Sequence, residues 1–282
     1  MTLICYIVDA FSDKAFHGNP AAVVPLDSWL SDDLLQAMAA EHNLAETVYF
    51  VQRPDGYDIR WFTPKTEVDL CGHATLASGF VIEQFIDPLA TSITFHSKSG
   101  PLGVAIRDGI YTLDFPSRPP TPCSPDEHLL GGLNLPAKEI LAARDYFAIY
   151  ETANEVRRLA PDMLALSRIH RFAVIVTAPG DESGVDFVSR FFAPAQGVPE
   201  DPVTGSAHST LIPYWAKRLG KTKMRAKQIS ERGGDLFCAL AGDRVKIGGN
   251  AVLYSKNEIY VPTLSQEFRK ISTQLTDSSQ TI

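Results

Sequence analysis

Two segments of this chain repeat one another, and this duplication restricts the possible folds more than any other feature. The run Arg-Trp-Phe-Thr-Pro at 60–64 returns at an offset of 130 as Arg-Phe-Phe-Ala-Pro at 190–194. Three extra residues then shift the offset to 133, at which Gly-His-Ala at 72–74 returns as Gly-Ser-Ala at 205–207. A helical pattern follows each triplet, and a strand hairpin follows each helix. The sequence therefore predicts two similar halves, each ordered strand, loop, helix, hairpin.

Local patterns assign much of the regular structure. Runs rich in β-branched and aromatic residues predict strands at 4–8, 21–24, 47–51, 57–62, 172–176 and 185–192. Ser31 is expected to cap a helix that Asn43 ends, and a capping box predicts another helix after Thr152. Asp108-Gly109 favours a type I′ hairpin turn, and a second hairpin turn is expected near Gly242. Pro213 falls inside the second repeated helix and should kink it or shorten its first segment.

A cluster of five prolines between 116 and 125 indicates a stiff connector without regular structure. We therefore expect an N-terminal lobe at 1–117, a proline-rich linker at 118–130 and a C-terminal lobe at 131–263. The remaining segment, 264–282, is rich in Ser, Thr and Gln and is expected to be a frayed polar tail.

Composition and charge exclude several classes of protein. Hydrophobic residues make up 45% and charged residues 21% of the 282 residues, as in ordinary globular proteins. The net charge of −7 argues against nucleic acid or an anionic membrane as a partner. The longest apolar runs fall short of the roughly 18 residues that a membrane span needs, and the start lacks a cationic leader, so we expect a cytoplasmic protein. The four cysteines are widely separated, which indicates neither a metal site nor a disulfide framework.

The two repeated glycines could form a binding site for an acid. Each opens a helix, and the first backbone N–H groups of a helix have no partners within it. If the lobes pack face to face, the helix starts at Gly72 and at Gly205-Ser206 converge on one small carboxylate or on a developing enolate. The ordinary alternative is that both are simply glycine-opened helices with normal caps.

Three side chains close to these helix starts could transfer protons: Glu46, His73 and Asp201. Each also has an ordinary structural interpretation when taken singly. A glutamate at a strand entry is usually solvated, a histidine at a helix start is usually structural, and an aspartate before proline usually forms a turn. Residue type and spacing leave both interpretations open.

At this point the sequence resembles a known family, the phenazine-biosynthesis PhzF-like isomerases, which are relatives of diaminopimelate epimerase. The resemblance extends over about residues 3 to 262 and keeps the order of the family's motifs. The matching segments are 9–11, 18–24, 44–48, 60–64, 67–75, 190–194 and 200–208.

The resemblance implies an α+β, diaminopimelate epimerase-like fold with two pseudo-symmetric lobes, each a β-barrel-like sheet around a central helix. It implies that Glu46 moves a proton between carbons of a small, cyclic, carboxylate-bearing metabolite, with His73 and Asp201 as its polar partners. It further implies a homodimer that works without metal or organic cofactor. The residues expected to line the substrate site are Asn19, Gly72, Gly205 and Ser206.

Cys71 marks a departure from diaminopimelate epimerase, which uses one cysteine from each half on opposite faces of the carbon. Here Cys71 precedes Gly72, but the matching stretch 202–205 has no cysteine. Two-thiol racemisation is therefore disfavoured, and we interpret Cys71 as a buried packing residue. A single carboxyl group can instead remove and return a proton on one face, which fits Glu46 with a pKa raised by an apolar cleft.

Two other functions use the same residues. Ser206, His73 and Asp201 are the residue types of a hydrolytic triad, although the chain has no Gly-x-Ser-x-Gly elbow. The protein could also be a non-catalytic binding protein that has kept the cleft without turnover. Such a binder would have no need to retain the proton-transfer residues together.

Overall fold

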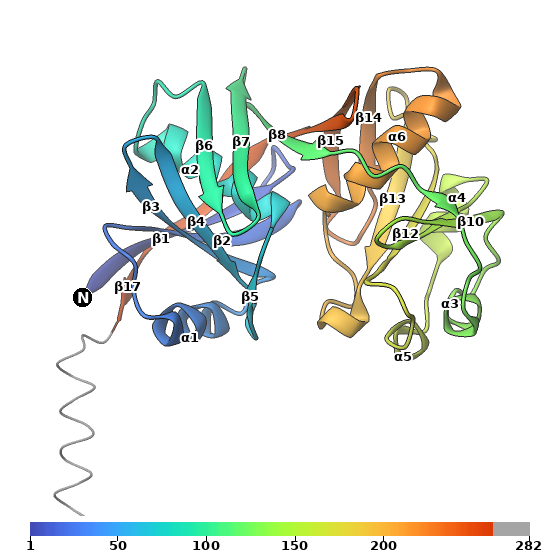
Figure 1. Cartoon of the computed structure of the whole chain (residues 1–282), viewed down its shortest axis with the longest axis horizontal. Helices are drawn as coiled ribbons and strands as arrows, with labels where there is room; N and C mark the ends of the chain where they lie inside the picture. Colours follow the sequence, from blue (N-terminus) through green and yellow to red (C-terminus); the bar gives the residue numbers. More distant parts are fainter. Residues whose placement is uncertain (262–282) are drawn as a thin grey trace, which may run out of the picture.

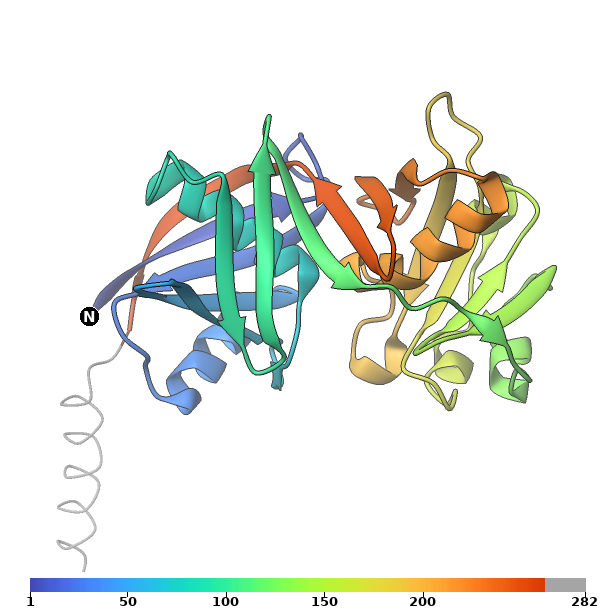
Figure 2. The same ribbon diagram turned by 45° about the horizontal axis from the view of Figure 1, so that its top comes forward.

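Two lobes lie side by side in the computed structural model, which describes residues 1–261 (Figures 1 and 2). The polar tail predicted at 264–282 lies outside the described residues. Within 1–261, no helix combines the length and the apolar character needed to cross a membrane.

The first half of the chain forms the strands and helices of one lobe. Its elements are β1 (Thr2–Ala10), β2 (Asn19–Leu26), α1 (Asp32–His42), β3 (Glu46–Arg53), β4 (Gly56–Phe62), β5 (Glu67–Val68), α2 (Gly72–Phe85), β6 (Ser92–Ser97), β7 (Gly100–Arg107) and β8 (Ile110–Pro116). The helix α2 lies inside this lobe, since every residue from Gly72 to Ile82 is buried.

The second half begins with a short strand in the connector and ends with the longest strand. Its elements are β9 (Thr121–Pro122), α3 (Glu127–Gly132), β10 (Glu139–Ala142), β11 (Tyr146–Ile149), α4 (Ala153–Arg158), α5 (Met163–Leu166), β12 (Val174–Pro179), β13 (Phe187–Phe192), the 3₁₀ turns η1 (Pro194–Gln196) and η2 (Gly205–Ala207), α6 (His208–Leu219), β14 (Lys223–Gln228), β15 (Gly234–Ala241), β16 (Arg244–Gly249) and β17 (Ala251–Tyr260).

Strand pairing follows the same order in both halves. In the first half β1 and β2 are antiparallel, β2 and β3 parallel, β3 and β4 antiparallel, and β4 and β6 parallel. In the second half the pairs β10–β11, β11–β12, β12–β13 and β13–β14 repeat that sequence of directions. Each half then closes with an antiparallel meander, β6–β7–β8 or β14–β15–β16. The pairing confirms the predicted duplication.

The repeated arginines make equivalent ion pairs. Arg60 donates from Nε and Nη2 to the two carboxylate oxygens of Glu67, at 2.8 and 2.9 Å. Arg190 does the same with Glu200, at 2.7 and 2.8 Å. The glutamate follows its arginine by seven residues in the first half and by ten in the second. The three-residue insertion therefore lies between arginine and glutamate, and each bidentate pair fixes the loop that leads to a helix start.

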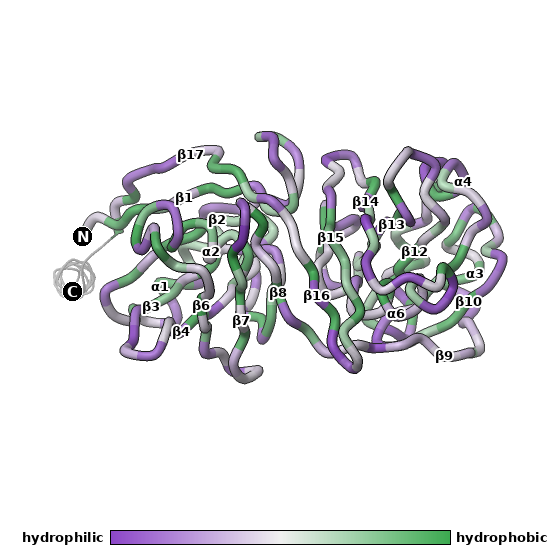
Figure 3. The backbone as a smooth tube through the Cα atoms, turned by 90° about the horizontal axis from the view of Figure 1, so that it is seen from above, coloured by the Kyte–Doolittle hydropathy of each residue, from purple (hydrophilic) through white to green (hydrophobic). Residues whose placement is uncertain are grey.

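The strand pairing departs from the predicted lobe boundaries at two places, in the connector and after β16. The connector contains regular structure, since β9 pairs with β10. The strands β8 and β16 pair between the lobes and join them into one continuous sheet (Figure 3). After β16, the strand β17 pairs with β1 along its whole length, from Thr2 opposite Tyr260 to Ala10 opposite Ala251. The segment 251–260, expected in the second lobe at 131–263, therefore covers the edge of β1 in the first lobe.

Most local expectations are confirmed at their named residues. Asn43 ends α1 in the left-handed conformation, with φ 49°, while Ser31 occupies the N-cap position without a side-chain hydrogen bond. Asp108 and Gly109 both have positive φ, at 50° and 73°, as the type I′ turn requires. The capping box at Thr152 is present.

Pro213 is accommodated inside α6 by the connector. A proline lacks the N–H group and therefore leaves the carbonyl four residues earlier, that of Ser209, without a helical donor. The backbone N–H of Arg118 donates to this carbonyl at 2.8 Å. The first turn of the repeated helix is a separate 3₁₀ turn, η2, so the α-helical part is shortened as predicted.

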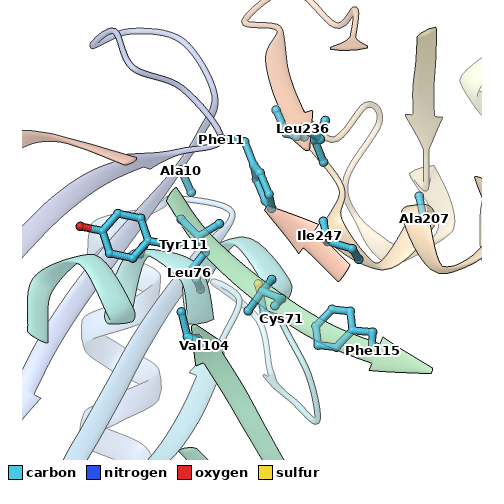
Figure 4. Packing of buried hydrophobic residues seen from close by; sticks show 14 of the residues in the cluster. Ala10, Phe11, Cys71, Leu76, Val104, Tyr111, Phe115, Ala207, Leu236 and Ile247 are labelled. Atoms are coloured by element: carbon cyan, nitrogen blue, oxygen red, sulfur yellow. The ribbon is translucent and has the colours of Figure 1, made fainter. Parts of the chain in front are cut away.

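Phe11 fills the junction between the lobes. It is fully buried, and in Figure 4 its ring reaches from the end of β1 toward Leu236 and Ile247 of the second half. Its N–H donates to the Asn250 carbonyl at 2.8 Å. A Cβ added at Gly249 would lie 2.4 Å from the ring atom Cδ1 of Phe11, so only glycine leaves room for this ring.

We expect Gly249→Ala to lower the free energy of unfolding by about 1–3 kcal/mol, because the added methyl group overpacks the junction at Phe11. Gly103→Ala is the matched control, since it is also a strand glycine and a Cβ there meets nothing within 4 Å. Urea unfolding measures both changes. Equal free energies of unfolding for the two variants would contradict this account of the junction.

Candidate active site

Asn19 and Glu46 lie at the same end of two neighbouring parallel strands. Asn19 is the first residue of β2, Glu46 is the first residue of β3, and the register places Ala21 opposite Glu46. Side chains alternate along a strand, so Asn19 and Glu46 share the face of Ala21 and Val48. Those two residues belong to the core cluster that packs around α2. The strand period therefore directs both polar side chains toward the start of α2.

The two helix starts meet at this point. A Cβ added at Gly72, the first residue of α2, would lie 3.6 Å from the Cα of Gly205 in η2. Neither Cys71 nor Thr204, which precede the glycines, caps its helix with a hydrogen bond from the side chain. The structure thus brings together the two glycines that the repeat singled out, with Ser206 next to the second.

The amide of Asn19 connects the two halves. Its Nδ2 donates to Asp201 Oδ1 at 2.8 Å and to the carbonyl of Val203 at 2.9 Å. The same nitrogen lies 3.1 Å from Nδ1 of His73. Glu46 completes the cluster, with its Oε2 3.2 Å from His73 Nε2. The sequence-predicted residues Asn19, Glu46, His73 and Asp201 therefore form one group, although they come from four separate parts of the chain.

Counting hydrogens assigns the tautomer of His73. The groups facing Nδ1 are the amide nitrogen of Asn19 and the thiol of Cys71, whose Sγ lies 3.5 Å away. An amide nitrogen donates and does not accept, so Nδ1 must be the acceptor and the proton of the neutral ring lies on Nε2. The two amide hydrogens are used at shorter distances by Asp201 and Val203, and the Cys71 thiol lies within hydrogen-bond reach of both Nδ1 and the Glu46 carboxyl group.

The Nε2–H group of His73 consequently faces Glu46. The two groups are close but poorly aligned, and both Nε2 and Oε2 are buried without a hydrogen bond among the described residues. Buried polar atoms are normally paired, so this unpaired couple is free to act on a bound molecule.

Burial sets the protonation states of the group. It raises the pKa of Glu46 to about 8, and the negative charge of Asp201 adds to the shift. It raises the pKa of Asp201 to about 6, against the opposing hydrogen bonds from Thr204 and Asn19. It lowers the pKa of His73 to about 3. At neutral pH Asp201 is therefore charged, Glu46 mainly carries its proton, and His73 is neutral.

Cys71 is buried, as predicted, but it is also part of the polar group. Burial and the charge of Glu46 raise the pKa of the Cys71 thiol well above its usual value, so it remains a donor. Glu46, Cys71 and His73 also present one ligand atom each within 4.8 Å of one another. This donor set suits a zinc-like cation. Binding one would require the thiol to lose its proton, which burial opposes.

Ser206 lies apart from the histidine. It is half-buried, and its hydroxyl accepts a 3.5 Å contact from Nη2 of Arg144. Neither ring nitrogen of His73 hydrogen-bonds Ser206: Nδ1 faces Asn19 and Cys71, and Nε2 carries the proton toward Glu46 and cannot accept the Ser206 hydrogen. The hydrolytic triad is therefore not assembled.

Thr204 and Gln228 belong to the site but were not singled out from the sequence. The Thr204 hydroxyl makes a short hydrogen bond with the second carboxylate oxygen of Asp201. Gln228 donates to the Asp201 carbonyl at 2.7 Å and accepts from the Thr204 N–H at 2.9 Å. The repeat could have revealed Thr204, which stands at the offset of 133 from Cys71. No local pattern marks Gln228.

Comparison with known proteins identifies one family. Residues 8–257 match the family model described as "Phenazine biosynthesis-like protein". An uncharacterised isomerase of Pseudomonas aeruginosa is 48% identical over 260 residues, covering 92% of this chain and 99% of that protein. The crystal structure of a PhzF-family phenazine biosynthesis protein from Enterococcus faecalis is similar at a TM-score of 0.90 with 44% identity. That match covers 93% of this chain and 100% of the other.

A more distant likeness concerns the fold. The crystal structure of a hydroxyproline epimerase from Agrobacterium vitis matches with a TM-score of 0.57 and 11% identity, covering 94% of both chains. At this identity the likeness shows the fold alone. The predicted α+β fold of the epimerase type is confirmed.

We predict that His73 keeps its Nε2–H tautomer and does not protonate between pH 5 and pH 8, because burial holds its pKa near 3. Nitrogen-15 NMR of imidazole-labelled protein reports the tautomer and the titration. Cys71→Ser, which keeps a donor to Nδ1, should leave the Nδ1 resonance nearer to its wild-type position than Cys71→Ala does. An Nδ1–H tautomer, or protonation near pH 6.5, would contradict the assignment.

A second prediction concerns stability as a function of pH. Glu46 has a pKa of about 8 in the folded protein and an ordinary value of 4.5, so the folded state binds its proton more tightly. Between these values the free energy of unfolding falls as pH rises, by up to about 1.4 kcal/mol per pH unit from this group. Glu46→Gln removes that dependence, so its stability relative to wild type should increase from pH 5 to pH 8. If the free energies of unfolding of the two proteins depend on pH in the same way, the shifted pKa is refuted. Glu41→Gln, at an exposed position of α1, serves as the control.

Proposed function

The chain belongs to the PhzF family of phenazine biosynthesis-like proteins, and on that premise we propose that it is an isomerase. In this proposal Glu46 moves a proton between two carbons of a small, cyclic, carboxylate-bearing metabolite. The observation that carries the proposal is the buried couple of Glu46 Oε2 and His73 Nε2, which has no hydrogen-bond partner among the described residues.

A single carboxyl group suits this reaction. Removing a proton from carbon needs the carboxylate, and returning it needs the acid, so a pKa of about 8 keeps both forms accessible near neutral pH. The carboxylate of Glu46 takes the proton from a substrate carbon next to a double bond. The electron pair left on that carbon shifts through the double bond toward the carboxylate of the substrate. The protonated Glu46 then delivers the proton to a second carbon on the same face. Atoms and charges balance without another reactant.

The neighbouring groups support each half of this step. His73 directs its Nε2–H toward Glu46 and can stabilise the carboxylate form without becoming charged. The backbone N–H groups at Gly72 and Gly205-Ser206 can hold the substrate carboxylate, where negative charge accumulates during the shift. Asp201 keeps its charge on the far side of Asn19, which disfavours premature ionisation of Glu46.

The proposal is tested by proton exchange with solvent. A panel of small unsaturated cyclic carboxylic acids is incubated with the protein in D₂O, and deuterium on carbon is measured by NMR and mass spectrometry. We expect exchange into at least one acid, and a loss of 10²–10⁴-fold in Glu46→Gln with binding of that acid retained. The exposed control Glu41→Gln should exchange at the wild-type rate. Binding without exchange in the wild type would favour the non-catalytic binding protein.

A further inference from the structure

Arg144 lies beside the second helix start but belongs to none of the proton-transfer contacts. It occupies the turn between β10 and β11, and its Nη2 reaches 3.5 Å from the hydroxyl of Ser206, 62 residues further along the chain. Its side chain remains 34% exposed. The contact therefore places an accessible guanidinium next to one of the residues that are expected to line the substrate site.

Two contacts, with Asp145 and with Phe172, fix the orientation of this guanidinium. Asp145, which is only 2% exposed, accepts from Arg144 Nε at 2.9 Å and from Nη2 at 3.0 Å. The guanidinium carbon also stacks over the ring of Phe172, 4.4 Å from the centroid. A bidentate ion pair and an aromatic stack together hold an arginine rigid, which reduces the ordering cost of a further contact.

Hydrogen-bonding capacity is left over after these contacts. A guanidinium has five N–H donors, and those toward Asp145 and Ser206 account for Nε and Nη2. Within residues 1–261, Nη1 of Arg144 has no hydrogen-bond partner in the protein, whereas Nη1 of the nearby Arg171 donates to the Ala143 carbonyl at 2.6 Å. Arg171 thus braces the same turn, and Arg144 keeps donors for another molecule.

The charges of the site favour an anion at this position. The proton-transfer group contains two carboxyl groups, Glu46 and Asp201, and a histidine that burial keeps neutral. A carboxylate entering this group meets like charge unless a cation faces it. The helix starts supply only partial positive charge, and Arg144 supplies a full one beside Ser206.

Phe172 adds a flat apolar face to the same position. It is a large aromatic residue with 42% of its surface exposed, directly under the guanidinium. An exposed aromatic ring next to a fixed cation suits a ligand that combines a planar ring with a carboxylate.

We propose that Arg144 is a substrate-binding residue whose guanidinium, oriented by Asp145, holds the carboxylate of a planar cyclic acid between Ser206 and Phe172. The proposal rests on the proposed function, because it adds a binding residue for the substrate of the same site. It makes Arg144 responsible for affinity, and it leaves the proton transfer itself to Glu46.

Binding of benzoate, with benzamide as its neutral counterpart, tests the proposal independently of turnover. Calorimetry or ligand-observed NMR should show benzoate binding to the wild type, weakened about tenfold or more in Arg144→Gln, since charge-assisted hydrogen bonds are lost. Arg144→Lys should recover only part of the affinity, because lysine keeps the charge but lacks the planar pair of N–H donors that binds both carboxylate oxygens. Arg171→Gln is the matched control for the turn and should bind benzoate as the wild type does.

Phe172→Ala tests the same site in case the arginine variants do not fold, because it leaves the Arg144–Asp145 ion pair in place. It should weaken benzoate binding, while Phe172→Tyr should retain it. For an acid that exchanges deuterium, Arg144→Gln should raise KM by about tenfold and lower kcat/KM by at least as much, because negative charge accumulates on the bound carboxylate. No benzoate binding by the wild type, or equal affinity in wild type and Arg144→Gln, would overturn the proposal. An unchanged KM in Arg144→Gln, with exchange still lost in Glu46→Gln, would overturn it while the proposed function stands.

Discussion

The rest of the site depends on one carboxyl group that the fold removes from water. Glu46 begins β3 on the face that points to α2, and Asn19 on the same face hydrogen-bonds Asp201 and Val203 of the second lobe. Because little solvent reaches it, the charged form of the carboxyl group is costly, so the proton stays on Glu46 at a pH where an ordinary glutamate has lost it. The junction between the lobes, with Phe11 buried in it and Asn19 joined to Asp201, therefore belongs to the environment that raises the pKa of this acid.

Duplication explains why the two helix starts meet, and divergence explains why they differ. The position before each helix glycine holds a side chain with one mobile hydrogen, the thiol of Cys71 or the hydroxyl of Thr204. The Thr204 hydroxyl hydrogen-bonds the carboxyl group of Asp201, while the Cys71 thiol lies against His73. One half thus stabilises a charged carboxylate, and the other surrounds a neutral acid. This asymmetry agrees with the proposed reaction, in which a single group transfers the proton, and differs from a mechanism with one thiol on each face.

The sequence predicts the parts of this structure that depend on local or repeated signals. The offset of 130 and then 133 between segments places both helix starts and both hairpins, and the paired arginines confirm it. Residue type and position singled out Glu46, His73 and Asp201 as candidates, but their role as partners came from the resemblance, because Asp201 reaches this group only when the lobes pack. The pairing of β17 with β1 is a choice between distant edges, and a strand pattern at 251–260 does not specify the partner. No sequence pattern marks Arg144, because an Arg-Asp dipeptide in a turn has no periodic signal.

The titration of Glu46 itself tests the central claim most directly. Protein labelled with carbon-13 at the glutamate side-chain carboxyl groups is titrated by NMR, and the Glu46 resonance is identified by its absence in Glu46→Gln. The enclosed, mainly protonated acid described above predicts an apparent pKa near 8 for that resonance. A midpoint near the ordinary value of 4.5 would contradict it, since Glu46 would then be a solvated carboxylate at neutral pH.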